Sequence, residues 1–484
     1  MKGLSSCGTH RRDTDMVSVK KDKAMMLQAF LGKLPEAIAA RLAKAIEVDR
    51  LSDGKSLPHE LILEGLRPAL RKLPKPDRTP SPLRLFCQPF EDLLSDAPRT
   101  QKQKGRIARS SVALVWNWLG QMLAPDALAA YSIGVKRAVL DYHFEDAMTR
   151  AAEFWPVAAA AIHEALDKEA TAKAARVALD GALAVEDARE IACLIAVAPE
   201  ILELQEKLPR QASPLTDDLI WSLRGIYDRL AADAPDAAPY VAVIAMNRLA
   251  RPWEALKLPV MISRQTQDTL IASTDMGLVG EIIFGNIEAH AAAIRATRHP
   301  DFDADALLKH LASFAELSTG IVKEVEMRRD GRWGQRLMKD RAAVAETMES
   351  LMERAPKEIL AALPMHRASF SGGPRTPDIS RPADPEKSDR AMRYAKLIVG
   401  CKHFAAAASF GAPVKDANEE VTVALRGYCD DLVREMRAAE GDKRANAELY
   451  FSIAAELTSL LFSPEEGEFL RRRGRAAAGP AAAA

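Results

Sequence analysis

Apolar residues recur at helical spacing along nearly the whole chain. In residues 213–231, for example, Leu219, Leu223, Ile226 and Leu230 fall on one face of a helix. Runs in which apolar and polar residues alternate, which would predict strands, are missing. The pattern therefore predicts an all-α protein with roughly fifteen helices and no significant sheet, arranged as an irregular array or as bundles.

The longest helical patterns lie in the second half of the chain. Residues 304–329 and 332–363 each predict one long helix, and Asp330 and Gly331 between them favour a turn. We expect the two helices to form a helical hairpin whose tip lies at residues 330–334.

Proline, glycine and charge divide the helical pattern into segments. Residues 364–389 combine several prolines with the pair Gly372 and Gly373, which is typical of a linker between domains. The predicted segments are a disordered basic N-terminus (1–22), an N-terminal helical region (23–96), a basic loop (97–108), a central helical domain containing the hairpin (109–363), the linker (364–389), a C-terminal helical domain (390–470) and a basic, Ala-rich tail (471–484).

Composition adds an expected compartment. The 484 residues are 48% hydrophobic and 28% charged, which excludes a chain that is disordered throughout. Five cysteines without a CxxC pair are too sparse for a disulfide scaffold and indicate reduced thiols. No secretory signal and no stretch apolar enough for a membrane span is found, so we expect a cytoplasmic protein. Frequent Ala, Arg and Pro favour a bacterial source.

Charge is balanced in total but uneven along the chain. Lys and Arg number 67, as do Asp and Glu, yet residues 1–110 carry a net charge of +9 and residues 141–240 a net charge of −10. The densest basic patch consists of Arg99, Lys102, Lys104, Arg106 and Arg109. It predicts one of three arrangements: contact with a nucleic acid or another anionic surface, docking on the acidic segment within or between chains, or unrelated solvated faces.

The hairpin tip carries a second basic pattern. Its cations surround one aromatic residue, a combination that serves stacking and phosphate contacts in proteins that bind single-stranded nucleic acids. The residues are Arg328, Arg329, Arg332, Trp333 and Arg336. Neighbouring acidic residues interrupt the pattern, so a capped surface turn is the alternative interpretation.

One weak candidate for catalysis lies near residue 143. On a continuous helix, Asp141 and Glu145 would share a face and His143 would lie near Asp146, as in an acid–base pair or half of a metal site. A solvated helix face is the alternative. Motifs for phosphate loops, zinc proteases, calcium loops and di-iron bundles are incomplete, so we expect no metal and no cofactor.

The sequence thus favours a non-catalytic, cytosolic interaction or scaffold protein that binds a protein partner or itself. A nucleic-acid-associated protein and an enzyme with an unrecognised helical pocket are the alternatives. Nothing in the sequence identifies a family.

Overall fold

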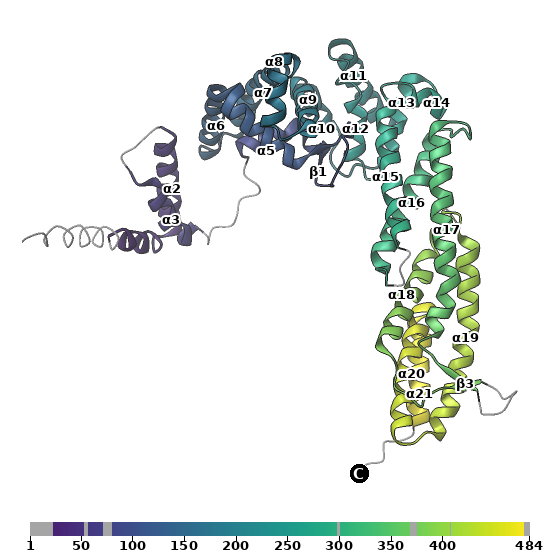
Figure 1. Ribbon diagram of the computed structural model, residues 1–484. Helices are drawn as coiled ribbons and strands as arrows, with labels where there is room; N and C mark the ends of the chain where they lie inside the picture. Colours follow the sequence, from purple (N-terminus) through teal and green to yellow (C-terminus); the bar gives the residue numbers. More distant parts are fainter. Residues whose placement is uncertain are drawn as a thin grey trace, which may run out of the picture. The chain divides into compact units, whose positions relative to one another are not determined.

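The computed structural model describes residues 23–52, 57–70, 80–297, 301–367, 375–406 and 408–478 (Figure 1). The predicted disordered segment 1–22 lies outside these ranges, as do parts of the predicted linker and tail. The all-α class is confirmed. Within these ranges the structure has 21 helices rather than the roughly fifteen expected, because many short helices separate the long ones.

The chain forms two compact units. Unit 1 contains the described residues up to Lys207 together with Asp228–Ala238, and unit 2 contains Leu208–Tyr227 and the described residues from Pro239 onward. This division falls inside the segment 109–363 that the sequence grouped as one central domain.

The first stretch of unit 1 runs from helical residues 23–31 to α10, with two short strands inserted, and Asp228–Ala238 completes the unit. Its further elements are α2 (Glu36–Leu51), α3 (His59–Leu70), α4 (Pro82–Cys87), the 3₁₀ helix η1 (Gln88–Leu93), β1 (Leu94–Ser95), β2 (Ile107–Ala108), α5 (Arg109–Trp118), the π-helical turn η2 (Leu119–Leu123), α6 (Pro125–Leu140), α7 (Phe144–Asp167), α8 (Glu169–Ala178), α9 (Ala182–Ala196) and α10 (Ala198–Lys207). Strands β1 and β2 pair in parallel over two residues each.

Helix α7 is the centre of unit 1 and packs against α6 and α9. Alanines such as Ala151 and Ala158 lie on its buried face, where their small side chains let neighbouring helices approach closely. Aromatic rings fill the space near α4: Tyr131 stacks on Phe154, and the indole of Trp155 donates a 3.2 Å hydrogen bond to the carbonyl of Phe86.

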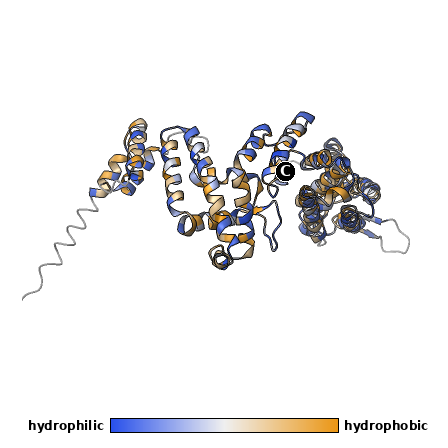
Figure 2. Cartoon of the chain, turned by 90° about the horizontal axis from the view of Figure 1, so that it is seen from above, coloured by the Kyte–Doolittle hydropathy of each residue, from blue (hydrophilic) through white to orange (hydrophobic). Residues whose placement is uncertain are grey.

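Unit 2 is built around long helices that run alongside one another (Figure 1). Its elements, the first of which extends beyond the unit, are α11 (Asp217–Asp233), α12 (Tyr240–Arg248), the 3₁₀ helix η3 (Pro252–Leu256), α13 (Lys257–Ser263), α14 (Asp268–Ala272), α15 (Gly277–Ala296), α16 (Ala304–Glu324), α17 (Arg332–Leu360), β3 (Met365–Arg367), β4 (Arg375–Pro377), α18 (Pro385–Cys401), α19 (Gly411–Ala438), α20 (Gly441–Leu461) and α21 (Pro464–Ala478). Helix α17 contacts α15, α18 and α19, and hydrophobic and hydrophilic residues share each long helix, as amphipathic packing requires (Figure 2).

The predicted hairpin of α16 and α17 is shorter at its tip than expected. Helix α16 ends at Glu324 rather than at residue 329, because the next residues are extended. Glu326 N donates a 2.8 Å hydrogen bond to the carbonyl of Thr266, and Asp268 N donates a 3.1 Å bond to the carbonyl of Glu326. This long-range pairing draws the chain out of the helix.

The described part of segment 364–389 packs within unit 2. Strands β3 and β4 pair antiparallel, from Met365 opposite Pro377 to Arg367 opposite Arg375. The amide of Asn446, on α20, donates a 3.1 Å hydrogen bond to the carbonyl of Ile379. Helices α17 and α18, which flank the segment, belong to the same compact unit. Among the described residues, no helix is long and apolar enough to cross a bilayer.

Candidate functional site

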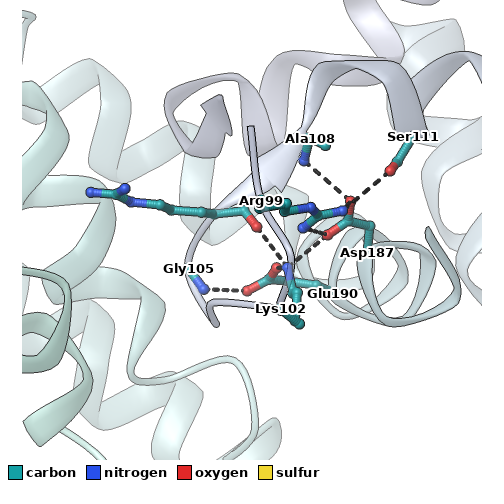
Figure 3. A network of polar contacts seen from close by, with 8 residues as sticks. Arg99, Lys102, Gly105, Ala108, Ser111, Asp187 and Glu190 are labelled. Atoms are coloured by element: carbon teal, nitrogen blue, oxygen red, sulfur yellow. Dashed lines mark hydrogen bonds and ion pairs between the residues drawn. The ribbon is translucent and has the colours of Figure 1, made fainter. Parts of the chain in front are cut away.

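The basic patch predicted at residues 99–109 is folded against a buried pair of carboxylates (Figure 3). Asp187 and Glu190 lie on α9 and are 0% and 5% exposed. Arg99 donates from both terminal nitrogens to the two carboxylate oxygens of Asp187. Lys102 Nζ lies 2.8 Å from Asp187 Oδ1 and forms a further ion pair with Glu190. Two of the predicted nucleic-acid contacts are therefore neutralised inside unit 1.

Backbone groups of the same loop complete this network. Gly105 N donates a 2.5 Å hydrogen bond to Glu190, and Ala108 N donates a 3.2 Å bond to Asp187. Lys102 also donates to the carbonyl of Arg106 at 2.7 Å. Because α9 receives both side-chain and backbone donors, its carboxylates position the whole loop between β1 and β2.

The network lowers the pKa of Asp187. Burial acts to raise this pKa, but hydrogen bonds from Arg99, Lys102 and Ser111 outweigh it, so the carboxylate stays charged. Intramolecular docking of basic residues on the acidic segment, one of the three arrangements left open by the sequence, describes this contact. Its sequence signal was Asp187 itself, which occupies the apolar phase of α9 between Ala184 and Ile191.

The other members of the basic patch are engaged as well. Arg109 is exposed, and its Nε lies 3.0 Å from Asp96. Lys104 and Arg106 also interact with other groups of the chain. Burial lowers the pKa of Arg106.

The hairpin tip does not present an aromatic stacking surface. Trp333 is 0% exposed, packs against Phe284 and Gly280, and donates a 2.7 Å hydrogen bond from its indole to Glu281. The prediction that it stacks on a base is therefore wrong, because α15 covers the ring. The turn residues beside Trp333 favoured an exposed ring, whereas the side chain packs in the core between α15 and α17.

Most cations at the tip have carboxylate partners. Arg336 bridges Glu281 and Glu288 at 2.7 Å each, and Arg332 lies 3.4 Å from Glu281. Arg328 pairs with Asp330 at 3.0 Å. Arg329 is exposed. The buried carboxylate of Asp268 accepts hydrogen bonds from the backbone N–H groups of Arg328 and Gly334. These two bonds hold the turn between α16 and α17 in place.

The candidate acid–base residues near position 143 are on the surface and do not share one helix. Asp141 directly follows the end of α6, Tyr142 has a left-handed φ of 61°, and Glu145 lies in the first turn of α7. His143 is 69% exposed and lies 3.5 Å from Asp146, while Asp141 pairs with Lys44. The predicted i, i+4 arrangement is thus wrong because the helix breaks between the two carboxylates.

Unit 2 contains a cavity that the sequence did not indicate. It has a volume of about 870 Å³ and lies between η3, α16 and the residues after α18. Its lining includes Arg251, Trp253, Glu254, Gly320, Lys323 and Glu324. The indole of Trp253 lies against Gly320, where an added Cβ would come within 2.2 Å of the ring.

Two carboxylates of this cavity have different surroundings. Glu254 is buried and accepts a 2.7 Å hydrogen bond from Leu215 N. Burial raises the pKa of Glu324, and the charge of Glu254 adds to the rise, while Lys257 and Lys323 oppose it. Glu254 thus accepts hydrogen bonds, whereas Glu324 has a raised pKa. Acid–base sites use such pairs of carboxylates with different surroundings.

Two imidazoles face each other in the same unit. His290 on α15 and His310 on α16 place their Nδ1 atoms 3.0 Å apart. Burial and the neighbouring ring lower the pKa of His290. The two residues lie 20 positions apart, so no spacing rule could have paired them.

The N-terminal helical residues of unit 1 expose large apolar side chains. Met26 and Phe30 lie one turn apart and are 73% and 63% exposed, and Met25 and Ile38 are also exposed. On their other side these helices bury a small core that includes Leu31 and Leu66.

Comparison with known proteins gives no relative. No protein-family model, no curated protein and no solved structure matches this chain.

Proposed function

We propose that this protein is a non-catalytic helical interaction or scaffold protein of the bacterial cytoplasm. The observation that supports the proposal most directly is a group of exposed large apolar side chains near the start of unit 1, called here the apolar face: Met25, Met26, Phe30 and Ile38. Soluble proteins that act alone rarely expose neighbouring large apolar residues, whereas interaction sites require them. Methionine suits such a face because its flexible thioether adapts to the shape of a partner.

The surroundings of this apolar face define the kind of partner. Lys23, Lys33 and Arg41 belong to the same N-terminal helical segment and are also exposed. These cations favour a protein whose apolar surface is accompanied by acidic residues, because complementary charge steers association and fixes orientation. A second copy of the chain, which has an acidic segment at residues 141–240, is one such partner.

The test compares two variants of the full chain. Met26→Ser/Phe30→Ser removes the apolar face, and Val177→Ser removes an exposed apolar residue elsewhere, which is 83% exposed. Affinity purification from the native host, with quantified co-purifying proteins, is combined with light scattering of the purified chain. We expect the double variant to lose a defined partner or self-association that Val177→Ser retains.

The same partners and the same mass in both variants would refute this contact face. Specific multiple-turnover conversion of a metabolite by the wild type would refute the non-catalytic assignment.

An enzyme with a helical pocket is the second candidate, and the cavity beside α16 favours it. For this candidate we propose a site at Trp253, Glu254 and Glu324 in place of the one expected at His143, because these three side chains line a cavity of about 870 Å³. Substrate-induced changes in the fluorescence of Trp253, lost together with turnover in Glu324→Gln, would support this function. Turnover that persists in Glu324→Gln would argue against it.

Nucleic-acid binding has the least structural support. Arg99 and Lys102 are paired with buried carboxylates, and Trp333 is covered. If it occurs, binding must fall steeply with salt and depend on exposed cations such as Arg109 and Arg329. Neutralising these two residues without loss of binding at low salt would exclude both from the contact.

A further inference from the structure

The facing histidines of α15 and α16 share one hydrogen bond. Their Nδ1 atoms are 3.0 Å apart and their ring centroids are 5.3 Å apart, so the two nitrogens point at each other. A hydrogen bond at this separation needs a proton on one nitrogen and a lone pair on the other. The bond therefore joins His290 to His310 only while one of the two Nδ1 atoms is unprotonated.

The two imidazoles can take up only one further proton without losing this bond. The first added proton binds Nε2 of the donating ring, which becomes an imidazolium and still donates from Nδ1. A second proton has to occupy the lone pair of the accepting Nδ1. The hydrogen bond is then lost and two like charges meet in its place, so the pair titrates in two separate steps.

Burial makes the second of these protons more costly. Ile294 lies one turn from His290 on α15, Phe314 lies one turn from His310 on α16, and both apolar side chains are fully buried. The two rings are half-buried, so protons reach them from solvent, yet water hydrates two adjacent charges there incompletely. Burial and, as the second cause, the charge of His310 lower the pKa of His290.

Charged groups on the elements packed against α15 and α16 are engaged with other partners. Those elements are α12, α14, η3, α17 and α18. The contacts are Arg248 with the carbonyl of Leu208, Asp268 with the backbone of Arg328 and Gly334, Glu254 with Leu215 N, Arg336 with Glu281 and Glu288, Asp340 with the charges of Glu288 and Arg295, Arg341 with the carbonyl of Ser318, Lys396 with Asp305, and Arg390 and Arg393 with Asp301. On the two helices themselves, Arg295, Lys309 and Glu316 are exposed. The charge that acts on His290 is that of His310.

We propose that His290 and His310 form a pH-sensitive contact, which holds α15 against α16 at neutral pH and loosens when both imidazoles are charged. Histidine suits this role because its ordinary pKa is about 6.5. The folded-state pKa of His290 is lowered, so the stabilisation is present above the ordinary histidine pKa and is lost as the pH falls through the lowered value. The contact needs neither a partner nor a substrate, so it goes beyond the function proposed above.

The experiment is hydrogen exchange of the full-length chain, followed by mass spectrometry at about pH 8 and about pH 5, with exchange times scaled for the intrinsic effect of pH. In the wild type, we expect peptides from α15 and α16 to exchange at least roughly tenfold faster at the lower pH, which is the effect of a one-unit pKa shift. Peptides from α19 serve as the internal reference. His290→Gln and His310→Gln should abolish this dependence on pH, because a single imidazole meets no second charge.

The matched control is His143→Gln, which removes an exposed histidine of unit 1 and should behave as the wild type. Equal protection of α15 and α16 at both pH values in the wild type would overturn the proposal. An acid-induced loss of protection that persists in both pair variants would overturn it as well, because the loss would then come from other groups.

A second readout follows the two imidazoles directly in the folded wild type. Nuclear magnetic resonance of chain labelled with carbon-13 at histidine Cε1 gives one signal for each ring, and the two variants assign the signals of the pair. We expect the pair to titrate in two separate steps, one of them below the ordinary histidine pKa of about 6.5. In His310→Gln, the signal of His290 should titrate at a higher pH than in the wild type. A single step at the ordinary pKa for both rings would contradict the shared proton.

Discussion

Two buried aspartates, Asp187 and Asp340, meet opposite surroundings. Asp187 is fully buried among donors from Arg99, Lys102, Ser111 and the backbone, and its pKa is lowered. Asp340, on α17, is 6% exposed, and its Oδ2 has no hydrogen-bond partner. Burial and the charge of Glu288 raise the pKa of Asp340, against nearby cations such as Arg336. A buried aspartate therefore stabilises unit 1 at position 187 and destabilises unit 2 at position 340.

Replacing Asp187 should destabilise the protein strongly. Asp187→Asn leaves Arg99 and Lys102 short of negative charge in a buried site, and breaking such a pair costs about 3–5 kcal/mol. Urea denaturation measures the loss. The control is Asp96→Asn, because Asp96 pairs with Arg109 on the surface and contributes about 0–1 kcal/mol. Equal effects of the two substitutions would contradict the buried network.

The two aspartates should also give opposite dependences on pH. The folded-state pKa of Asp187 is lowered, so its stabilisation is present above the ordinary aspartate value and is lost as the pH falls below it. The folded-state pKa of Asp340 is raised. Its contribution to stability is therefore present below the ordinary aspartate pKa and is lost as the pH rises through the raised folded-state pKa. Asp340→Asn should therefore raise the free energy of unfolding by about 1 kcal/mol at pH 7 and not at pH 3. No gain at pH 7 would show that Asp340 is better accommodated than its burial indicates.

At the scale of elements, glycines decide how closely helices meet aromatic rings. Gly320 on α16 lies under Trp253, and Gly280 on α15 lies under Trp333, where an added Cβ would come within 2.2 Å of each ring. In contrast, Gly427 in the middle of α19 has no atom within 4 Å of an added Cβ. Helix propensity alone would favour alanine at all three positions, so packing determines the first two.

Substituting alanine at these positions should have effects of opposite sign. Gly320→Ala displaces the indole of Trp253 and should cost about 1–3 kcal/mol through overpacking. Gly427→Ala should stabilise the protein by about 0.5–1 kcal/mol, because alanine loses less backbone freedom in a helix. Thermal unfolding followed by tryptophan fluorescence reports both. A stabilised Gly320→Ala would mean that Trp253 does not pack on α16.

At the scale of the whole molecule, the chain contains two compact units. Its zero net charge follows from its balanced composition. Within unit 1, basic residues of the loop after β1 also pair directly with acidic residues of α9. Three of the cysteines are also buried inside the units. Cys87, Cys401 and Cys429 are buried free thiols, and burial raises the pKa of Cys401 to about 12, which makes it unreactive.

Because the chain forms two compact units, we expect more than one unfolding transition. We expect the calorimetric enthalpy to exceed the van't Hoff enthalpy, because each unit unfolds with its own cooperativity. Asp187→Asn should shift the transition of unit 1, and Gly320→Ala that of unit 2. A single two-state transition that both substitutions shift equally would show instead that the units unfold together.

Local patterns predicted the fold class but not the location of individual side chains. The hairpin of α16 and α17 followed from its apolar period and the turn at Gly331. Its tip was misjudged because the pairing of Glu326 with Thr266 joins residues far apart in the chain. Trp333 likewise became a core residue only when α15 packed over it.

The sequence by itself determined the all-α class, the long helices and the uneven charge, because helical period, turn residues and charge are properties of near neighbours. Only the tertiary structure decided where those charges act. Lys102 and Glu190 are 88 residues apart in sequence, and His290 and His310 are 20 apart. Such pairs form when helices pack, and burial then determines whether a charged side chain supports the core or remains available to a partner.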